Sequence, residues 1–393
     1  MLVNDIKIKF NEVFNKIFND SYDKIFFSPG RINLIGEHTD YNGGFVFPCP
    51  ITLGTYAAIN KRPDNIFKVY SLNFENKGVI EFSLDNLEYR KEDDWANYIK
   101  GVVKFLLEQG FKINHGFNMA IYGNLPNGAG LSSSASLEML CAKIFREEFN
   151  LDMDDVQAAL LGKTVENKYI GVNSGIMDQF AISLGKKDTA IQLDCNTLNY
   201  EYVPVKLGDK TIVIMNTNKR RELADSKYNE RRAECDSSLE KLKEACNIEA
   251  LCELTPEEFE KHAHLINDET KIKRCRHAIY ENARVKKAVE ALKENDIITF
   301  GKLMNDSHIS LRDDYEVTGK ELDTLAKVSW KQPGVLGARM TGAGFGGCAI
   351  AIVNNDSVEN FIANVGQAYK DAIGYEASFY IASIGDGPTV IEI

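Results

Sequence analysis

The sequence predicts a two-domain protein that contains both strands and helices. Its 393 residues exceed the roughly 150 that a single domain typically uses. Strand-like and helix-like segments alternate in the first half, whereas the second half is rich in helices. The chemical character of the chain changes between two predicted strands, 189–193 and 211–215. We therefore expect one domain over 1–205 and a second, helix-rich α+β domain over 206–393.

The composition is that of a globular protein and argues against two classes of partner. Lys and Arg number 46 against 57 Asp and Glu, which gives a net charge of −11. This excess of negative charge opposes binding to nucleic acid or to an anionic membrane. No apolar run approaches the ~20 residues of a membrane span. We expect neither nucleic acid nor membrane as a partner, and no obligatory protein partner is evident.

The cysteines and the N-terminal segment favour a cytoplasmic location. The eight cysteines are widely spaced without a C-x-x-C pair, and the six histidines show no metal-binding spacing. This pattern fits reduced thiols and predicts no structural zinc site. Apolar residues between 6 and 18 recur at helical spacing among charges, which predicts an amphipathic helix and not a signal peptide.

The next segments predict strands that lead into a dense polar loop. A strand over 24–30 ends in a predicted turn at Pro29-Gly30, and a second strand covers 31–36. The loop that follows, 37–44, is either a capped turn or a set of binding groups. A metal site through His38 and Asp40 would need more ligands than these two. Further strands are predicted over 55–60, 66–73 and 79–84.

A helix over 95–109 is predicted to be capped by Asp93-Asp94 and to end at Gly110. Trp95 and Tyr98 are three residues apart and therefore share one face of this helix. That face is either part of the core or the wall of a binding site. The sequence of the helix alone leaves both alternatives open.

A glycine- and serine-rich loop over 123–136 follows a predicted strand and precedes a predicted helix over 137–149. Its glycines allow the backbone to approach a ligand closely, and Ser132, Ser133 and Ser134 stand where the helix begins. Such a loop is either an ordinary capped turn or a phosphate site at a helix N-terminus. It does not match the Walker P-loop or the protein-kinase motifs.

Two acidic residues lie on the helices that follow. Glu166 is near the end of a predicted helix over 155–169, and Asp178 lies in the first turn of another over 176–184. A carboxylate in a first turn either interacts with the helix dipole or serves as a catalytic base. Helices are predicted in the second half over 224–245, 256–266, 272–294, 297–306, 319–331 and 357–372, with strands over 335–340, 348–353 and 377–384. The glycine-rich loop 341–347 is either a turn with bulges or a place of close backbone approach.

Together the two glycine-rich loops suggest a nucleotide site. The first loop has no lysine, so backbone N–H groups, hydroxyls and Mg²⁺ would have to balance the phosphate charge. Phosphoryl transfer requires a metal, charge stabilisation and a group that orients the acceptor. The sequence offers Ser134 and Glu166 for the metal, Arg31 for the charge and Asp178 as the base. The polar loop 37–40 suits a polyhydroxylated acceptor.

Four segments resemble one family, in the family's order. Residues 29–44, PGRINLIGEHTDYNGG, are similar to the galactokinase signature. Residues 125–136 resemble the ATP-binding motif of the superfamily of galactokinase, homoserine, mevalonate and phosphomevalonate kinases. Residues 175–180 and 340–348 resemble two further galactokinase motifs. The first segment is highly specific, whereas the second identifies only the superfamily.

The resemblance implies a fold and an activity. It implies an α+β fold of two domains with the active site between them, the first like ribosomal protein S5 domain 2 and the second ferredoxin-like. It implies ATP-dependent phosphorylation of α-D-galactose at C1 in the Leloir pathway, with Mg²⁺ as cofactor. The alternatives are a related sugar-1-kinase for N-acetylgalactosamine or arabinose and a non-catalytic galactose- and ATP-binding regulator. The intact run 132–136 together with Asp178 argues against the regulator.

The resemblance also implies roles for single residues. Asp178 would accept the proton of the C1 hydroxyl or orient that hydroxyl, and Arg31 would stabilise negative charge and favour an ionised Asp178. The implied sugar-binding residues are Glu37, His38, Asp40, Gly175 and Tyr228. The implied ATP-binding residues are Trp95, Tyr98, Gly128, Ala129, Gly130, Leu131, Ser132, Ser133 and Ser134. The implied Mg²⁺ ligands are Ser134 and Glu166.

Overall fold

A six-stranded sheet forms the frame of the N-terminal domain in the computed structural model, which describes residues 3–126, 129–219 and 224–392. Its strand order is β13-β1-β3-β6-β4-β5, and all neighbours are antiparallel except β4 and β6. The strands are β1 (Lys24–Asn33), β3 (Pro48–Lys61), β4 (Ile66–Ser71), β5 (Ile80–Ser83), β6 (Phe117–Gly123) and β13 (Thr389–Ile391). Most of β1 and β3 is buried, because helices cover both faces of the sheet.

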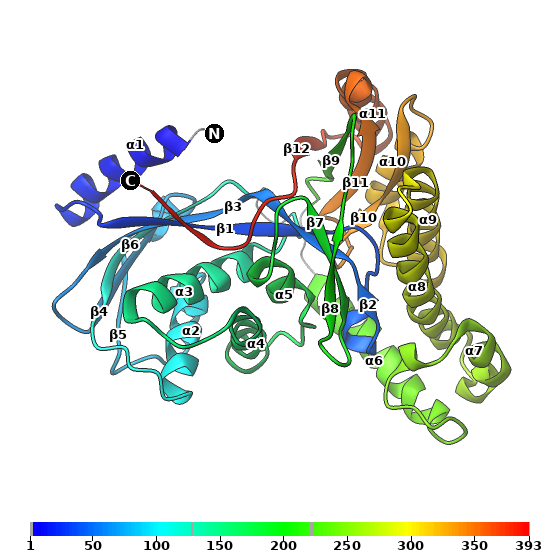
Figure 1. Cartoon of the computed structure of the whole chain (residues 1–393), viewed down its shortest axis with the longest axis horizontal. Helices are drawn as coiled ribbons and strands as arrows, with labels where there is room; N and C mark the ends of the chain where they lie inside the picture. The colour runs from blue at the N-terminus through cyan, green and yellow to red at the C-terminus, as the bar shows by residue number, and fades with distance from the viewer. Residues whose placement is uncertain (1–2, 127–128, 220–223, 393) are drawn as a thin grey trace.

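Alternating side chains along β1 supply both faces of this sheet. Ile25 packs with Phe10 of the first helix, whereas Phe26 packs in the larger core on the opposite face. Figure 1 shows α1 on one face of the sheet and α2 to α5 on the other. These helices are α1 (Val3–Val13), α2 (Ala96–Glu108), α3 (Ser133–Phe149), α4 (Asp155–Thr164) and α5 (Met177–Ser183).

The expected turn at Pro29-Gly30 is wrong, because the chain continues through it as one strand. The pairing of β1 with β3 shifts its register between Pro29 and Arg31, as at a β-bulge. Gly30 is required there because a Cβ atom would lie 2.7 Å from the carbonyl oxygen of Leu131. The backbone N–H of Arg31 donates to the same carbonyl at 3.2 Å. This irregularity brings the glycine- and serine-rich loop directly against β1.

The expected cap of α2 by Asp93-Asp94 is also wrong. The helix has no side-chain cap. Asp93 instead accepts hydrogen bonds from Lys100 Nζ at 2.7 Å and from Arg90 Nε at 2.9 Å. Lys100 is almost fully buried, so this carboxylate balances a charge in the interior. The acidic residue Asp93 before this helix is therefore explained by its pairing with the buried lysine and not by helix capping.

The C-terminal domain is built on an antiparallel sheet with the strand order β10-β11-β9-β12. This is the order of a β-α-β-β-α-β ferredoxin-like arrangement, which confirms the expectation for this domain. The strands are β9 (Lys210–Asn216), β10 (Val335–Thr341), β11 (Cys348–Asn354) and β12 (Ser378–Ala382). The helices are α6 (Ala224–Leu242), α7 (Pro256–His262), α8 (Glu269–Lys293), α9 (Ile297–Ser310), α10 (Gly319–Ser329) and α11 (Val358–Ile373).

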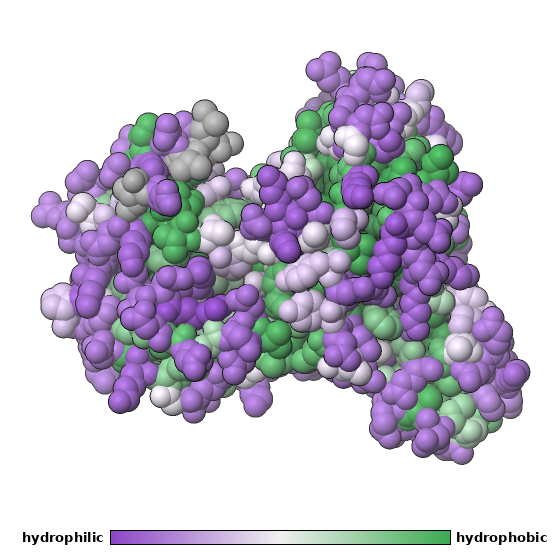
Figure 2. All heavy atoms as spheres, viewed as in Figure 1, coloured by the Kyte–Doolittle hydropathy of each residue, from purple (hydrophilic) through white to green (hydrophobic). Residues whose placement is uncertain are grey.

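Alternation along β9 again separates two cores. Ile212 and Ile214 pack with residues of α8 and α9, whereas Val213 and Met215 pack with residues of α10 and α11. A small sheet of β2 (Phe45–Val46), β7 (Thr189–Asp194) and β8 (Tyr200–Pro204) completes the fold. Figure 2 shows that hydrophilic residues cover most of the visible face of both domains. The boundary near residue 205 stays a prediction.

The last strand returns to the first domain. After β12 the chain runs back, and β13 pairs with β1 so that Ile391 lies opposite Ile25 (Figure 1). Two π-helical segments, Val165–Ile170 and Leu311–Tyr315, follow α4 and α9. Within the described ranges, no helix combines the length and the apolar character that a membrane crossing requires.

Candidate active site

An arginine–carboxylate pair lies where β1 meets the start of α5. Arg31 Nε and Nη2 donate to the two carboxylate oxygens of Asp178, both at 2.9 Å. Arg31 Nη1 donates to the carbonyl of Gly130 at 2.8 Å. The arginine side chain is 5% exposed and that of Asp178 is 30% exposed. A bidentate pair of this kind fixes both groups, so the carboxylate is held rigidly while it still reaches the cavity.

Asp178 does not cap its helix. No side-chain cap is present on α5, and the hydroxyl of Ser132 donates to Asp178 Oδ2. Ser132 has a left-handed backbone, with φ of +60°, and its hydroxyl does not cap α3. Oδ2 therefore accepts from two protein donors and Oδ1 from one. A carboxylate oxygen has two lone pairs, so Oδ1 keeps one for a ligand hydroxyl.

A second carboxylate, that of Glu166, contacts the start of α3 in the first domain. Ser134 Oγ donates to Glu166 Oε1 at 2.9 Å, and Ser174 Oγ donates to the other oxygen. Burial raises the pKa of Glu166, the hydrogen bonds from Ser174 and Ser134 lower it, and the nearby charge of Asp178 raises it. Glu166 lies on a π-helical turn, an irregularity frequent at functional sites.

The Ser134–Glu166 pair fits part of a Mg²⁺ site. Mg²⁺ takes oxygen ligands, usually one or two from the protein with the rest from waters and phosphates. Among the described residues, no group of three or more His, Cys, Asp or Glu side chains is arranged to hold a metal. The chain would therefore supply two adjacent oxygen ligands and leave the remaining positions to a nucleotide and water.

Glu37 is the first residue of the polar loop 37–44 that follows β1, and its side chain is buried. It accepts hydrogen bonds from Asn33 Nδ2 at 3.0 Å, from the backbone N–H of Gly342 at 2.7 Å and from Arg339 Nη1 at 3.3 Å. Burial raises the pKa of Glu37, and the positive charges of Arg339 and Arg31 oppose that shift. This carboxylate thus links the polar loop of the first domain to the glycine-rich hairpin of the second.

Arg339 is a functional candidate that the sequence analysis missed. It is fully buried on β10 and donates to the carbonyl of Asn33 at 3.0 Å. It also faces Glu281 at 3.8 Å. Burial alone would raise the pKa of Glu281, but the charges of Arg284, His277 and Arg339 lower it to about 2. The available signal was a single arginine inside an apolar strand, VLGARM.

Asp40 and Gly175 are brought together as a fitted pair. A Cβ atom built on Gly175 would overlap the carboxylate of Asp40, so only glycine leaves that carboxylate in place. Burial raises the pKa of Asp40 to about 6, and the negative charges of Asp178 and Glu37 contribute to the same shift. Four carboxylates, those of Glu37, Asp40, Glu166 and Asp178, therefore line one small cavity, which makes the protonation of Asp40 sensitive to its occupant.

His38 has both ring nitrogens engaged by the protein. Nδ1 lies 2.8 Å from the hydroxyl of Tyr41, and Nε2 lies 3.2 Å from the carbonyl oxygen of Ala343. Burial is the main cause that lowers the pKa of His38 to about 3, so the ring is neutral. The ring of Tyr228 lies beside it, with centroids 5.7 Å apart. His38 has a left-handed φ of +62°.

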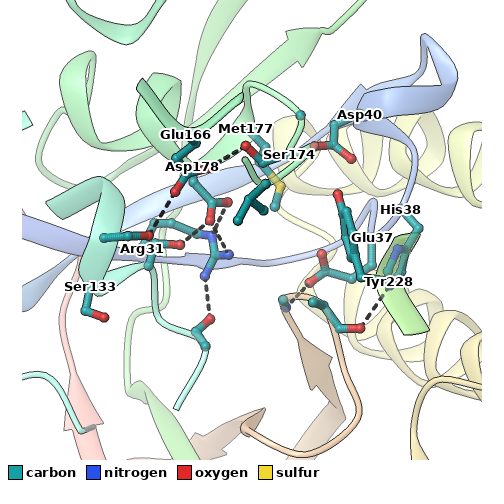
Figure 3. A pocket seen from close by; sticks show the side chains of 17 residues that line it. Arg31, Glu37, His38, Asp40, Ser133, Glu166, Ser174, Met177, Asp178 and Tyr228 are labelled. Carbon is teal, nitrogen blue, oxygen red and sulfur yellow. Dashed lines mark hydrogen bonds and ion pairs between the residues drawn. The ribbon is translucent and has the colours of Figure 1, made fainter. Parts of the chain in front are cut away.

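These side chains surround one cavity of about 280 Å³ between the two domains. Figure 3 shows Arg31 and Asp178 at one end and Glu37, His38 and Tyr228 at the other. The lining residues that the sequence analysis named are Arg31, Glu37, His38, Asp40, Gly130, Ser132, Ser133, Ser134, Glu166, Gly175, Asp178 and Tyr228. The lining residues that it did not name as site residues are Val172, Ser174, Met177, Gly342 and Ala343.

A second cavity of about 240 Å³ lies against the first. Trp95 and Tyr98 line it, as expected, together with Phe74 and Leu137. The indole N–H of Trp95 is buried without a hydrogen-bond partner there. Ser133 and Ser134 line both cavities, so the start of α3 is their common wall.

Two predicted nucleotide residues lie elsewhere. Ala129 and Leu131 line neither cavity, and their side chains are buried in the apolar core between the domains. Gly128 lies outside the described residues. The second glycine-rich loop meets the first, since a Cβ on Gly342 would lie 2.9 Å from the carbonyl oxygen of Gly130. Close approach of two backbones therefore explains this glycine.

Comparisons with known proteins converge on one family. The galactokinase galactose-binding signature matches residues 12–61, the GHMP kinase N-terminal domain 97–186 and the GHMP kinase C-terminal model 288–371. The galactokinase of Clostridium perfringens is 70% identical over 99% of this chain and 100% of that protein. The galactokinase of Fusobacterium nucleatum is 61% identical over 98% of this chain and 99% of that protein.

The solved structures agree. The crystal structure of Lactococcus lactis galactokinase complexed with galactose is 54% identical, with a TM-score of 0.96 over 98% of this chain and 99% of that one. The mevalonate kinase of Methanococcus jannaschii is 19% identical, with a TM-score of 0.67 over 93% of this chain and 99% of that one. The second likeness shows the shared two-domain fold alone.

Proposed function

This chain belongs to the galactokinase family, and we propose that its two adjoining cavities hold galactose and ATP during phosphoryl transfer. The protein is a kinase that phosphorylates α-D-galactose at its C1 hydroxyl with ATP, giving galactose 1-phosphate and ADP. The placement of the two substrates rests on one observation: Ser133 and Ser134 form a wall that the two cavities share. A donor and an acceptor on its two sides would meet beside Asp178.

The acceptor side supplies the groups that orient the sugar. We propose that the C1 hydroxyl donates to the remaining lone pair of Asp178 Oδ1. As the hydroxyl oxygen bonds to the γ-phosphorus of ATP, the bond from that phosphorus to the oxygen of the leaving ADP breaks. The hydroxyl proton passes to this carboxylate, or the carboxylate only orients the hydroxyl until the proton leaves with solvent. Arg31 holds Asp178 through two hydrogen bonds and places positive charge beside the reacting oxygen. Glu37, Asp40 and Tyr228 line the remainder of the sugar cavity.

The donor side supplies an apolar slot and an anion site. We propose that the base occupies the cavity lined by Trp95 and Tyr98 and that the phosphates reach toward the start of α3. Backbone N–H groups at a helix N-terminus favour phosphate. Ser134 and Glu166 would hold Mg²⁺, which neutralises phosphate charge when it is bound. We also propose a cytoplasmic location, where ATP is available and where thiols such as the eight free cysteines stay reduced.

An ATP-turnover assay over a panel of sugars tests the proposed substrate. We expect turnover with galactose and much weaker turnover with arabinose and N-acetylgalactosamine. Turnover with the galactosamine derivative and none with galactose would overturn the assignment of the acceptor. The related sugar-1-kinases and the non-catalytic regulator are not favoured, because the relatives and the galactose-bound structure are galactokinases.

A magnesium titration tests the proposed metal ligands. Glu166→Gln should require a higher Mg²⁺ concentration for half-maximal rate, because it removes one of the two proposed protein ligands. Glu148→Gln is the matched control, because Glu148 lies at the C-terminal end of α3, where it pairs with Lys24 of β1. An unchanged Mg²⁺ requirement in Glu166→Gln would remove Glu166 from the site.

A further inference from the structure

A chain of buried hydrogen bonds runs from the sugar cavity into the second domain. The carbonyl of Ala343 contacts His38 Nε2 at 3.2 Å, and His38 Nδ1 contacts the hydroxyl of Tyr41 at 2.8 Å. The hydroxyl of Tyr41 contacts that of Tyr315 at 2.8 Å, and the hydroxyl of Tyr315 contacts Cys235 Sγ at 3.3 Å. We call this series the His38 hydrogen-bond chain.

The chemistry of its first member fixes the direction of every bond. A backbone carbonyl can only accept, so the ring hydrogen of His38 must be on Nε2. A neutral imidazole carries one ring hydrogen, so Nδ1 is an acceptor and Tyr41 must donate to it. The hydroxyl hydrogen of Tyr41 is then used, and Tyr315 must donate to Tyr41. By the same reasoning Cys235 donates its S–H to Tyr315.

We propose that Tyr41 and Tyr315 are positioning residues that hold His38 as its Nε2–H tautomer, so that its one ring hydrogen stays on the carbonyl of Ala343 and fixes these two lining residues of the sugar cavity relative to each other. The proposal rests on the proposed function only in placing the sugar beside His38. Through His38, the two tyrosines would contribute to the choice of substrate without touching it.

The packing around the chain supports one fixed arrangement. The ring of Tyr315 packs in a tilted arrangement against those of His38 and His277, with its centroid 4.7 Å from each. Tyr315 is fully buried at the end of a π-helical turn, and its pKa is raised well above the ordinary value by burial. Neither phenol therefore gives up its hydrogen at neutral pH. Asn42 Nδ2 additionally holds the backbone carbonyl of His38 at 2.7 Å.

The tautomer is directly measurable by NMR of the ¹⁵N-histidine-labelled protein. The spectrum should show His38 with a protonated Nε2 and an unprotonated Nδ1 throughout the neutral range, the signals being assigned through their loss in His38→Gln. In Tyr41→Phe the Nδ1 acceptor loses its donor, and a mixture of tautomers should appear. A wild-type His38 protonated at Nδ1, or a Tyr41→Phe spectrum identical to wild type, would overturn the proposal.

Kinetics provide a graded readout. Tyr41→Phe should raise the KM for galactose about tenfold, the size expected when one buried acceptor loses its partner, with the KM for ATP unchanged. Tyr315 is one hydrogen bond further from His38. Tyr315→Phe should therefore raise the KM for galactose only about two- to threefold, because Tyr41 can still donate to His38. Tyr202→Phe is the matched control, since it also removes a tyrosine hydrogen bond, to Leu184, remote from the cavity.

A double-mutant cycle separates positioning from general stabilisation. In the His38→Gln background the added Tyr41→Phe change should have no further effect on the KM for galactose, because its route of action is already removed. An undiminished effect in that background would overturn the proposal. If Tyr41→Phe does not fold, the Tyr315→Phe spectrum and KM decide. If galactose were not the substrate, the histidine spectra would still report the tautomer.

Discussion

The most decisive perturbation of the site is Asp178→Asn. The substitution keeps the size and shape of the side chain but replaces one carboxylate oxygen by an NH₂ group and removes the charge. In the native protein the two oxygens accept from Arg31 Nε, Arg31 Nη2 and the Ser132 hydroxyl. An amide has one oxygen for these three donors, and its NH₂ group must face at least one of them. The change therefore affects both charge and alignment.

The magnitude follows from the role of the carboxylate. General-base catalysis contributes about 10²- to 10⁴-fold, and each factor of ten in rate corresponds to about 1.4 kcal/mol. We expect kcat to fall at least about 100-fold, a loss of at least about 2.7 kcal/mol in transition-state stabilisation. The KM for ATP should stay within a few-fold, because Asp178 does not line the cavity of Trp95 and Tyr98.

The assay is the release of ADP at saturating galactose, with ATP varied. Asp155→Asn is the matched control, because Asp155 also lies in the first turn of a helix and also pairs with an arginine, Arg146. Its kcat should equal that of the wild type. A kcat for Asp178→Asn within a few-fold of wild type would refute the assignment of Asp178 to the reacting hydroxyl.

Three further predictions concern the sugar side of the site. Gly175→Ala should raise the KM for galactose more than about tenfold without changing that for ATP, because its methyl group displaces Asp40; an unchanged KM would contradict this fit. The pKa of Asp40 is raised from 3.8 to about 6, so folding favours its protonated form, and its contribution to the free energy of unfolding should fall as pH rises through that interval. The difference in free energy of unfolding between wild type and Asp40→Asn, measured with urea at pH values from 3.8 to about 6, should therefore change with pH. Arg339→Met should cost about 3–5 kcal/mol in urea unfolding, because it leaves Glu37 buried without its partner.

The sequence predicted those parts of the molecule that depend on local spacing. Asp178 was placed in the first turn of a helix, and the glycine- and serine-rich loop was placed between a strand and a helix. Both are confirmed. The order of the strands and helices predicted over 211–384 is also confirmed, because each of these elements carries its own pattern of apolar residues, whereas β13 was not predicted.

Long-range packing decided the features that were mispredicted or missed. Pro29-Gly30 is a local turn signal, yet pairing with β3 keeps it in a strand. Asp93 stands where a cap belongs, but a buried lysine nearby recruits its carboxylate. Arg339 is explained by partners distant in the sequence, among them Glu37, about three hundred residues earlier in the chain. No local pattern specifies which distant charge a buried charge will meet.

The pairing of β13 with β1 has a consequence for biosynthesis. Residues 389–391 leave the ribosome after all the other described elements, yet they lie beside the strand that carries Arg31. Domains generally fold as units during synthesis, the N-terminal one first. Here the edge of the N-terminal sheet at β1 stays unpaired until residues 389–391 have been made, and an exposed edge is a template for pairing with other chains. Nascent chains that stall shortly before residue 389 would thus carry both kinase domains with one open, association-prone edge.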